Sequence, residues 1–139
     1  MAVRRTTAGG VSRSWAAATN SSGALTSSEL IQRHLPASAV VKAFNNIYYR
    51  HLASLARPSG AADRSYLPIA GDDAAAKVAV TDFLDSIGYG AIDAGPLAEG
   101  WRQQPGTPVY GAPYGSFQDK KGSPASAGAI RRALAAAER

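Results

Sequence analysis

The pattern of apolar and polar positions after the first 25 residues begins with a helix and then a strand. Apolar residues at helical spacing predict a short helix over 27–34, and Thr26-Ser27-Ser28-Glu29 has the spacing of a capping box. The run 39–44, Ala-Val-Val-Lys-Ala-Phe, contains one charge, which is typical of a strand buried on both faces of a parallel sheet. A further helix is expected over 47–55.

A strand, a helix and another strand follow in the next part of the chain. Residues 66–70 predict a strand, although Pro68 argues against a central position in a sheet. Asp72-Asp73 precedes a helix expected over 74–87, and 89–94 predicts the next strand. A strand, helix and strand in this order imply a right-handed parallel crossover. We therefore expect an α/β chain with about three short strands and flanking helices.

The segment after residue 104 has neither a helical nor a strand pattern. Over 104–118, prolines and glycines alternate with aromatic residues, which predicts a long irregular loop. Such a loop either covers a functional site or packs as an arm, and we expect an arm against a neighbouring domain or subunit. Ser123-Pro124 then opens a last helix. The expected organisation is a disordered arm over 1–25, an α/β region over 26–104, a loop over 105–122 and a C-terminal helix over 123–139.

Length and composition narrow the function classes. The chain has 139 residues, 45% of them hydrophobic, which suits a single domain with its own core. It contains no cysteine, so disulfide frameworks, thiol nucleophiles and cysteine-based metal sites are excluded. No apolar run approaches the 18 residues of a membrane span, and we expect no membrane partner.

The net charge of +5 belongs largely to the N-terminal arm. Residues 1–28 contain Arg4, Arg5 and Arg13 and no acid, and they have few large apolar side chains. Such a segment buries too little surface to offset its ordering entropy, so disorder is expected. Neither an apolar stretch nor a cleavage site follows the arginines, which favours a cytoplasmic location. Nucleic acid is not an expected partner, because no dense basic cluster with interleaved aromatic residues occurs.

Catalytic side chains are not apparent in the sequence. The Asp72-Asp73 pair suits helix capping, and His34 and His51 lie on different predicted helices without further metal ligands. The tripeptide Gly88-Tyr89-Gly90 follows a helix and precedes a strand, the reverse of a pyrophosphate loop. A complete dinucleotide site therefore cannot be built from this sequence alone, and no catalytic or metal-ligating residue is predicted.

Three ordered motifs carry a resemblance to a known family. They are Val41-Lys42-Ala43-Phe44-Asn45-Asn46-Ile47, Leu67-Pro68-Ile69-Ala70-Gly71-Asp72-Asp73 with Ala76-Lys77 after it, and Asp93-Ala94-Gly95-Pro96-Leu97. In this order the chain resembles the C-terminal half of the NADP oxidoreductases that use a hydroxy-deazaflavin coenzyme. The resemblance implies the C-terminal part of a Rossmann-type sheet, and hydride transfer between NADPH and the deazaflavin, with the cofactors supplying the reactive carbons.

The same resemblance implies cofactor-binding residues. Asn45, Asn46 and Ile47 would line the deazaflavin pocket, and Arg102 and Thr107 would contact the anionic tail of the coenzyme. Without the resemblance, Asn45-Asn46 is interpreted as a turn and Arg102 as a solvated charge.

The N-terminal Gly-rich loop that grips NADP in this family has no counterpart here. We therefore expect a truncated or remnant form whose NADP site is incomplete, with a homodimer or a partner domain as an open possibility. The alternative from another class is a non-catalytic binding or assembly module that engages a partner chain or nucleic acid.

Overall fold

The structure is a computed structural model, and it describes residues 1–4 and 25–139. Most of the arm expected to be disordered, residues 5–24, lies outside the described residues. The elements are β1 (Ala2–Arg4), α1 (Ser27–His34), β2 (Ser38–Lys42), α2 (Tyr49–Ser54), β3 (Tyr66–Gly71), α3 (Ala74–Ser86), β4 (Gly90–Asp93), the 3₁₀ helices η1 (Leu97–Gln103) and η2 (Ala112–Tyr114), and α4 (Ala127–Ala135).

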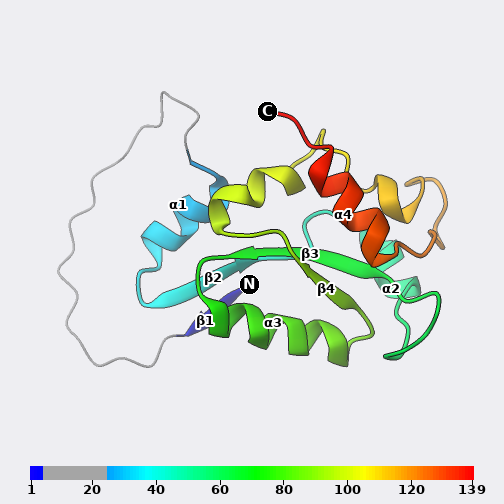
Figure 1. Cartoon of the computed structure of the whole chain (residues 1–139), viewed down its shortest axis with the longest axis horizontal. Helices are drawn as coiled ribbons and strands as arrows, with labels where there is room; N and C mark the ends of the chain where they lie inside the picture. Colours follow the sequence, from blue (N-terminus) through cyan, green and yellow to red (C-terminus); the bar gives the residue numbers. More distant parts are fainter. Residues whose placement is uncertain (5–24) are drawn as a thin grey trace.

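The fold is α/β, as expected, with helices on both faces of a mixed sheet. The strand order is β1-β2-β3-β4. Helix α3 covers one face, whereas α1, η1 and α4 cover the other (Figure 1). The crossover from β3 through α3 to β4 is parallel, as the order of elements predicts. The capping box at Thr26 is present at the start of α1.

The expectation of a parallel strand at 39–44 is wrong, because β2 runs antiparallel to both of its neighbours. Helix α2 lies at one end of the sheet and does not cross a face, so the chain returns in the opposite direction (Figure 1). The strand also stops at Lys42, before Phe44 adopts a left-handed φ of 68°.

Residues 2–4, which the sequence analysis places in a disordered arm, form the edge strand β1. The outer edge of β2 offers unpaired backbone groups, and pairing with β1 satisfies them. Next to β1, the amino group of Met1 donates to Val41 O and the Val41 amide donates to Met1 O, each at 2.7 Å.

Pro68 occupies the centre of β3, although β3 lies between two other strands. The carbonyls of Ser65 and Ile69 accept bonds from the β4 side, so Pro68, which alternates with them, directs its ring nitrogen toward β2. The β2 pairing ends at Ala70 and does not reach Pro68. The missing N–H therefore breaks no ladder bond.

The last helix begins at Ala127, three residues after the proline expected to open it. Ala125 is extended instead, because its carbonyl accepts from the Tyr66 amide at 2.9 Å and its amide donates to Ser65 Oγ at 3.2 Å. Ser126 then caps the helix by accepting from the Ala129 amide.

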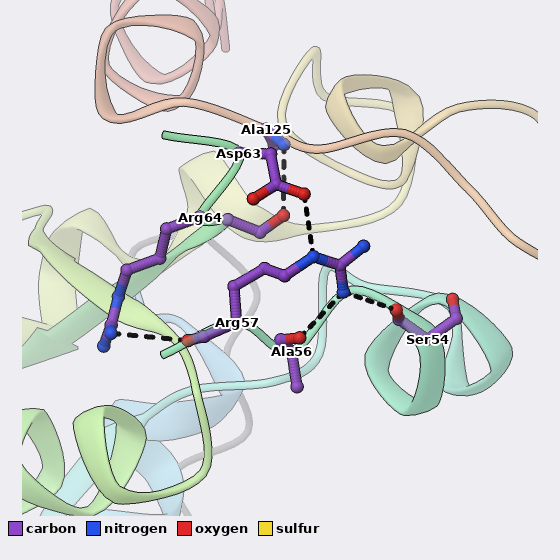
Figure 2. Close-up of polar contacts among 7 residues, drawn as sticks. Ser54, Ala56, Arg57, Asp63, Arg64 and Ala125 are labelled. Atoms are coloured by element: carbon purple, nitrogen blue, oxygen red, sulfur yellow. Dashed lines mark hydrogen bonds and ion pairs between the residues drawn. The ribbon is translucent and has the colours of Figure 1, made fainter. Parts of the chain in front are cut away.

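Polar contacts hold the loop between α2 and β3 against this segment (Figure 2). Arg57 donates to a carboxylate oxygen of Asp63 at 2.7 Å and to the carbonyls of Ser54 and Ala56. Arg64 is buried and reaches Arg57 O, and it forms an ion pair with Asp85 at 2.6 Å. These contacts are internal to the fold and fix the point at which β3 begins.

Helix α3 provides a matched test of the core. Val80 is 0% exposed between the helix and the sheet, whereas Val78 on the same helix is 59% exposed. We expect Val80→Ala to lower the free energy of unfolding by about 2 kcal/mol through lost burial and a residual cavity. Val78→Ala should change it by less than about 0.5 kcal/mol. Equal effects in urea denaturation would contradict this packing.

The buried Tyr89 phenol should make the folded chain less stable at alkaline pH. The side chain is buried, its hydroxyl donates to Leu52 O at 2.7 Å, and burial raises its pKa to about 12. Between the ordinary pKa near 10 and about 12, the unfolded chain binds fewer protons than the folded chain, so stability falls as pH rises. Tyr89→Phe should reduce this fall and cost about 1 kcal/mol at neutral pH. Urea titrations from neutral pH upward would show both effects, and an unchanged alkaline slope would refute the assignment.

Candidate functional site

A small cavity lies where the chain leaves β2. Its volume is about 150 Å³, and it is lined by Asn45, Asn46, Ile47, Tyr48, Tyr49, Tyr110 and Phe117. We call it the Asn–Tyr cavity. It brings together the three residues from the first motif with aromatic residues from the loop over 105–122.

Asn46 forms the buried base of the Asn–Tyr cavity. Its side-chain nitrogen donates to Val109 O and Tyr114 Oη, each at 3.2 Å. The side-chain oxygen of Asn46 is buried and has no hydrogen-bond partner among the described residues. Because a buried polar atom without a partner is costly, this oxygen is suited to accept a hydrogen bond from a ligand.

Tyr114 connects this base to the sheet. Its hydroxyl donates to Tyr66 O at 2.8 Å, and the side chain is 0% exposed. Burial raises the pKa of the Tyr114 phenol, which therefore remains protonated at neutral pH. Asn45 is held separately, since its amide nitrogen donates to Gln103 O at 2.7 Å. The two asparagines are thus fixed by long-range contacts, beyond the local turn that their sequence predicts.

Aromatic rings form the walls of the Asn–Tyr cavity. The Tyr48 ring meets the Tyr49 and Phe117 rings edge to face, with centroid distances of 4.7 and 5.5 Å. Tyr49 and Phe117 are 65% and 53% exposed. The positive φ of Phe44 turns the chain immediately before the cavity, a strained conformation of the kind often found beside binding sites.

The loop over 105–122 packs on its own chain, so it is not required as an arm for a neighbouring domain or subunit. Val109 and Tyr114 are fully buried in the core, and the Gly111 amide donates to Asn46 O at 2.8 Å. At the far end of the loop, His51 Nε2 meets Asp119 O at 2.5 Å. Gly122 lies so close to the His51 ring that an added Cβ would be 2.8 Å from it.

Arg102 lies outside the Asn–Tyr cavity. Its Nε donates to Glu99 Oε2 at 2.6 Å, and its Nη1 donates to Leu134 O and Ala137 O. The guanidinium also lies 4.5 Å from the centre of the Trp101 ring. These contacts fasten η1 to the end of α4.

Thr107 is also used internally, because its hydroxyl donates to the carbonyls of Arg102 and Gln104. Arg102 instead borders a second, wider hollow of about 420 Å³ beside β4 and α4. The structure therefore groups Asn45, Asn46 and Ile47, and it does not bring Arg102 or Thr107 to them. Contact of the latter two with an anionic tail stays a prediction.

The position of the cavity in the sheet differs from the expected one. Asn45 follows the carboxyl end of β2, as the sequence predicts, but β2 is antiparallel to β3. The cavity therefore lies at the amino ends of β3 and β4, because Asn46 is connected through the Tyr114 hydroxyl to Tyr66 O, and Tyr66 pairs with Gly90. The rule that ligands bind beyond the carboxyl ends of parallel strands consequently does not support this site.

Four lining residues were missed by the sequence analysis as site residues: Tyr48, Tyr49, Tyr110 and Phe117. Two of them directly follow Asn45-Asn46-Ile47, and two belong to the aromatic loop. Adjacency in the sequence could therefore have indicated Tyr48 and Tyr49, whereas the contact between the motif and the aromatic loop depends on the tertiary structure.

Other site classes find no support in the described part of the chain. Asp73 caps α3 through the Ala76 amide, and Asp72 accepts from the Leu97 amide at 2.8 Å. Among residues 1–4 and 25–139, no group of three histidine or acidic side chains is placed to hold a metal ion. Within those same ranges, none of the helices has the length and apolar composition needed to cross a bilayer.

No family model matches the chain, and two of the known proteins to which it is similar match it in part. "Putative protein YjhV" of Escherichia coli (strain K12) is 38% identical over 53 residues, which are 38% of this chain and 39% of that protein. A solved structure from Arthrobacter sp. FB24, described as a "putative F420 dependent NADP-reductase", is 30% identical over 58% of this chain and 36% of its own, with a TM-score of 0.48. Both matches thus span well under half of the relative's length.

The contacts of Arg102 predict a structural effect. Arg102→Ala removes a charged donor from Glu99 and from the end of α4, so the free energy of unfolding should fall by about 1–2 kcal/mol. Arg131→Ala is the control, because Arg131 is exposed, borders the same hollow and forms no ion pair within the described residues. Chemical denaturation compares the two, and equal stability of both variants would contradict the fastening role.

Proposed function

We propose that this chain binds a hydroxy-deazaflavin coenzyme and supplies the deazaflavin side of a hydride-transfer site for NADPH. The observation that carries the proposal is Asn46, a buried residue with an unpartnered side-chain oxygen that is also one of the residues lining a cavity with aromatic walls. One edge of a deazaflavin ring offers an N–H donor of the kind that this oxygen lacks. The aromatic rings around it suit the flat face of the same ligand.

The size of the cavity limits how much of the ligand it encloses. Whole-ligand pockets occupy about 300–1,000 Å³, whereas the Asn–Tyr cavity measures about 150 Å³. In this proposal one edge of the ring enters the cavity, and the remainder lies against the exposed rings of Tyr49 and Phe117.

The three motifs that resemble the deazaflavin-dependent oxidoreductases occupy adjacent parts of one sheet. The first contributes the end of β2 and the base of the cavity, the second forms most of β3 and the start of α3, and the third joins β4 to η1. This arrangement agrees with the resemblance, since motifs of one structural unit should lie together.

NADP does not fit the residues present. The junction from β3 to α3 is where a pyrophosphate loop would open a helix, but Asp73 already occupies the Ala76 amide there, and Asp72 accepts from the Leu97 amide of η1. Two carboxylates at this helix N-terminus also repel a pyrophosphate. In our proposal the NADP-binding residues therefore come from outside this sequence, as expected for a truncated or remnant form.

The role of the chain is to bind and orient, without acid–base chemistry of its own. When bound, the deazaflavin ring supplies the carbon that exchanges a hydride with the nicotinamide. Asn46 fixes one edge of the ring, and the neutral Tyr114 phenol holds Asn46 in place. The aromatic walls exclude water from the enclosed edge and favour a single orientation.

Titration of the purified chain tests the proposal. We expect saturable binding of the hydroxy-deazaflavin coenzyme, and no comparable binding of NADPH alone. Loss of deazaflavin absorbance on addition of NADPH would show that the chain also completes the transfer, which would refute an incomplete NADP site. Absence of deazaflavin binding, together with salt-sensitive retention on nucleic acid, would instead support the non-catalytic binding module.

Phe117 provides a variant that tests the wall of the cavity. Its ring is 53% exposed, so Phe117→Ala should leave the fold intact. Loss of an aromatic contact of about 0.5–1.5 kcal/mol should weaken coenzyme binding about 2- to 10-fold. Ile31→Ala is the control, since Ile31 is similarly exposed but belongs to α1. Equal affinities of both variants in a fluorescence titration would remove Phe117 from the site.

A further inference from the structure

An exposed cation lies at the rim of the Asn–Tyr cavity. Arg50 directly follows Tyr49, which lines the cavity, and its guanidinium carbon lies 5.5 Å from the centre of the Tyr49 ring. Its Nε donates to Tyr49 Oη at 3.0 Å. Arg50 is exposed and forms no ion pair with any described carboxylate, and its guanidinium also interacts with the Tyr48 phenol.

The charges around this rim are mainly positive. None of the described residues that line the cavity is acidic. The loop that carries Phe117 continues to Lys120 and Lys121, and it is held to α2 by Ser54 Oγ, which donates to Lys121 O at 2.5 Å. Asp119 is the acid of this loop, and its Oδ1 accepts from the Lys121 amide. An anion that approaches the cavity therefore meets an attractive field.

Arg102, by contrast, has its strongest donors engaged. Its Nε and Nη1 are bonded to Glu99 and to carbonyls at the end of α4, and it borders the other hollow. Moving it to an anionic ligand would cost those bonds, whereas Arg50 is exposed and has only neighbouring phenols as partners among the described residues.

We propose that Arg50 is the specificity-determining residue that receives the anionic tail of the ligand whose ring edge enters the Asn–Tyr cavity. This inference rests on the proposed function and extends it to the tail of the coenzyme. The forked donors of a guanidinium match phosphate and carboxylate oxygens, which form short charge-assisted hydrogen bonds. Tyr49 is a positioning residue, since its hydroxyl tethers the Arg50 guanidinium beside the ring-binding walls.

The electrostatics of the Tyr49–Arg50 pair agree with this assignment. The hydrogen bond from Arg50 lowers the pKa of the Tyr49 phenol. A bound anion would compete for the same guanidinium and weaken that effect. The Tyr49 absorbance titration should therefore shift to higher pH when an anionic ligand binds.

The test compares two probes on the full chain. They are the hydroxy-deazaflavin coenzyme with its anionic tail and the same deazaflavin chromophore without the tail. Arg50→Ala should weaken binding of the tailed coenzyme about tenfold and leave the tail-less chromophore unaffected. Arg50→Lys should recover part of the loss, because lysine keeps the charge without the fork. Arg131→Ala controls for removal of one surface arginine, and far-ultraviolet circular dichroism verifies folding.

Each outcome separates the inference from the proposed function. If Arg50→Ala leaves tailed binding unchanged while Arg102→Ala weakens it, the inference is overturned and the proposed function remains. If the wild-type chain binds both probes with equal affinity, no tail contact exists and the inference is likewise overturned. If the wild-type chain binds neither probe, both proposals fail. Loss confined to Arg50→Ala and the tailed coenzyme, with reduced salt dependence, supports the inference.

Discussion

The antiparallel pairing of β2 with β3 sets the direction in which the chain leaves the sheet. It joins Val41 to Gly71 and Lys42 to Ala70, and the strand then ends before the left-handed Phe44. Because β2 points toward the amino ends of β3 and β4, Asn45 and Asn46 emerge beside Tyr66 and not beside Gly71. Had β2 run parallel, the same asparagines would lie at the opposite edge, near the capped start of α3.

A series of hydrogen bonds holds the segment after β2 against the loop over 105–122, and the Asn–Tyr cavity lies between them. Tyr66 O accepts from the Tyr114 hydroxyl, and Tyr114 Oη accepts from the Asn46 amide. The Gly111 amide donates to Asn46 O, and this second hydrogen bond also joins the loop to the segment that follows β2. Buried polar groups of this kind are costly unless paired, so the network fixes the loop in one arrangement. The side-chain oxygen of Asn46 has no partner in that network, and the proposed ligand would donate a hydrogen bond to it.

The two hollows described above differ in the contacts that their arginines already make. At the hollow beside β4 and α4, Arg102 connects η1 to the end of the last helix. At the Asn–Tyr cavity, Arg50 is exposed, is tethered by the Tyr49 phenol and also interacts with the Tyr48 phenol. A charged side chain engaged in internal bonds is a poor ligand contact, because those bonds must first be broken. The two sites therefore differ less in charge than in how far the arginine guanidinium is free to contact a ligand.

Sequence alone was enough to predict the local elements: the capping box at Thr26, the Asp73 cap and the parallel crossover from β3 to β4. The caps depend on residues a few positions apart, and the crossover follows from the rule for strand–helix–strand connections, so a single sequence is enough to predict both. The orientation of β2, the hydrogen bond between Ala125 and Tyr66 and the placement of Tyr110 and Phe117 at the same cavity as Asn46 depend on the tertiary structure. Those features join segments some 30 to 70 residues apart, and their energies come from burial and long-range hydrogen bonds that periodicity does not record.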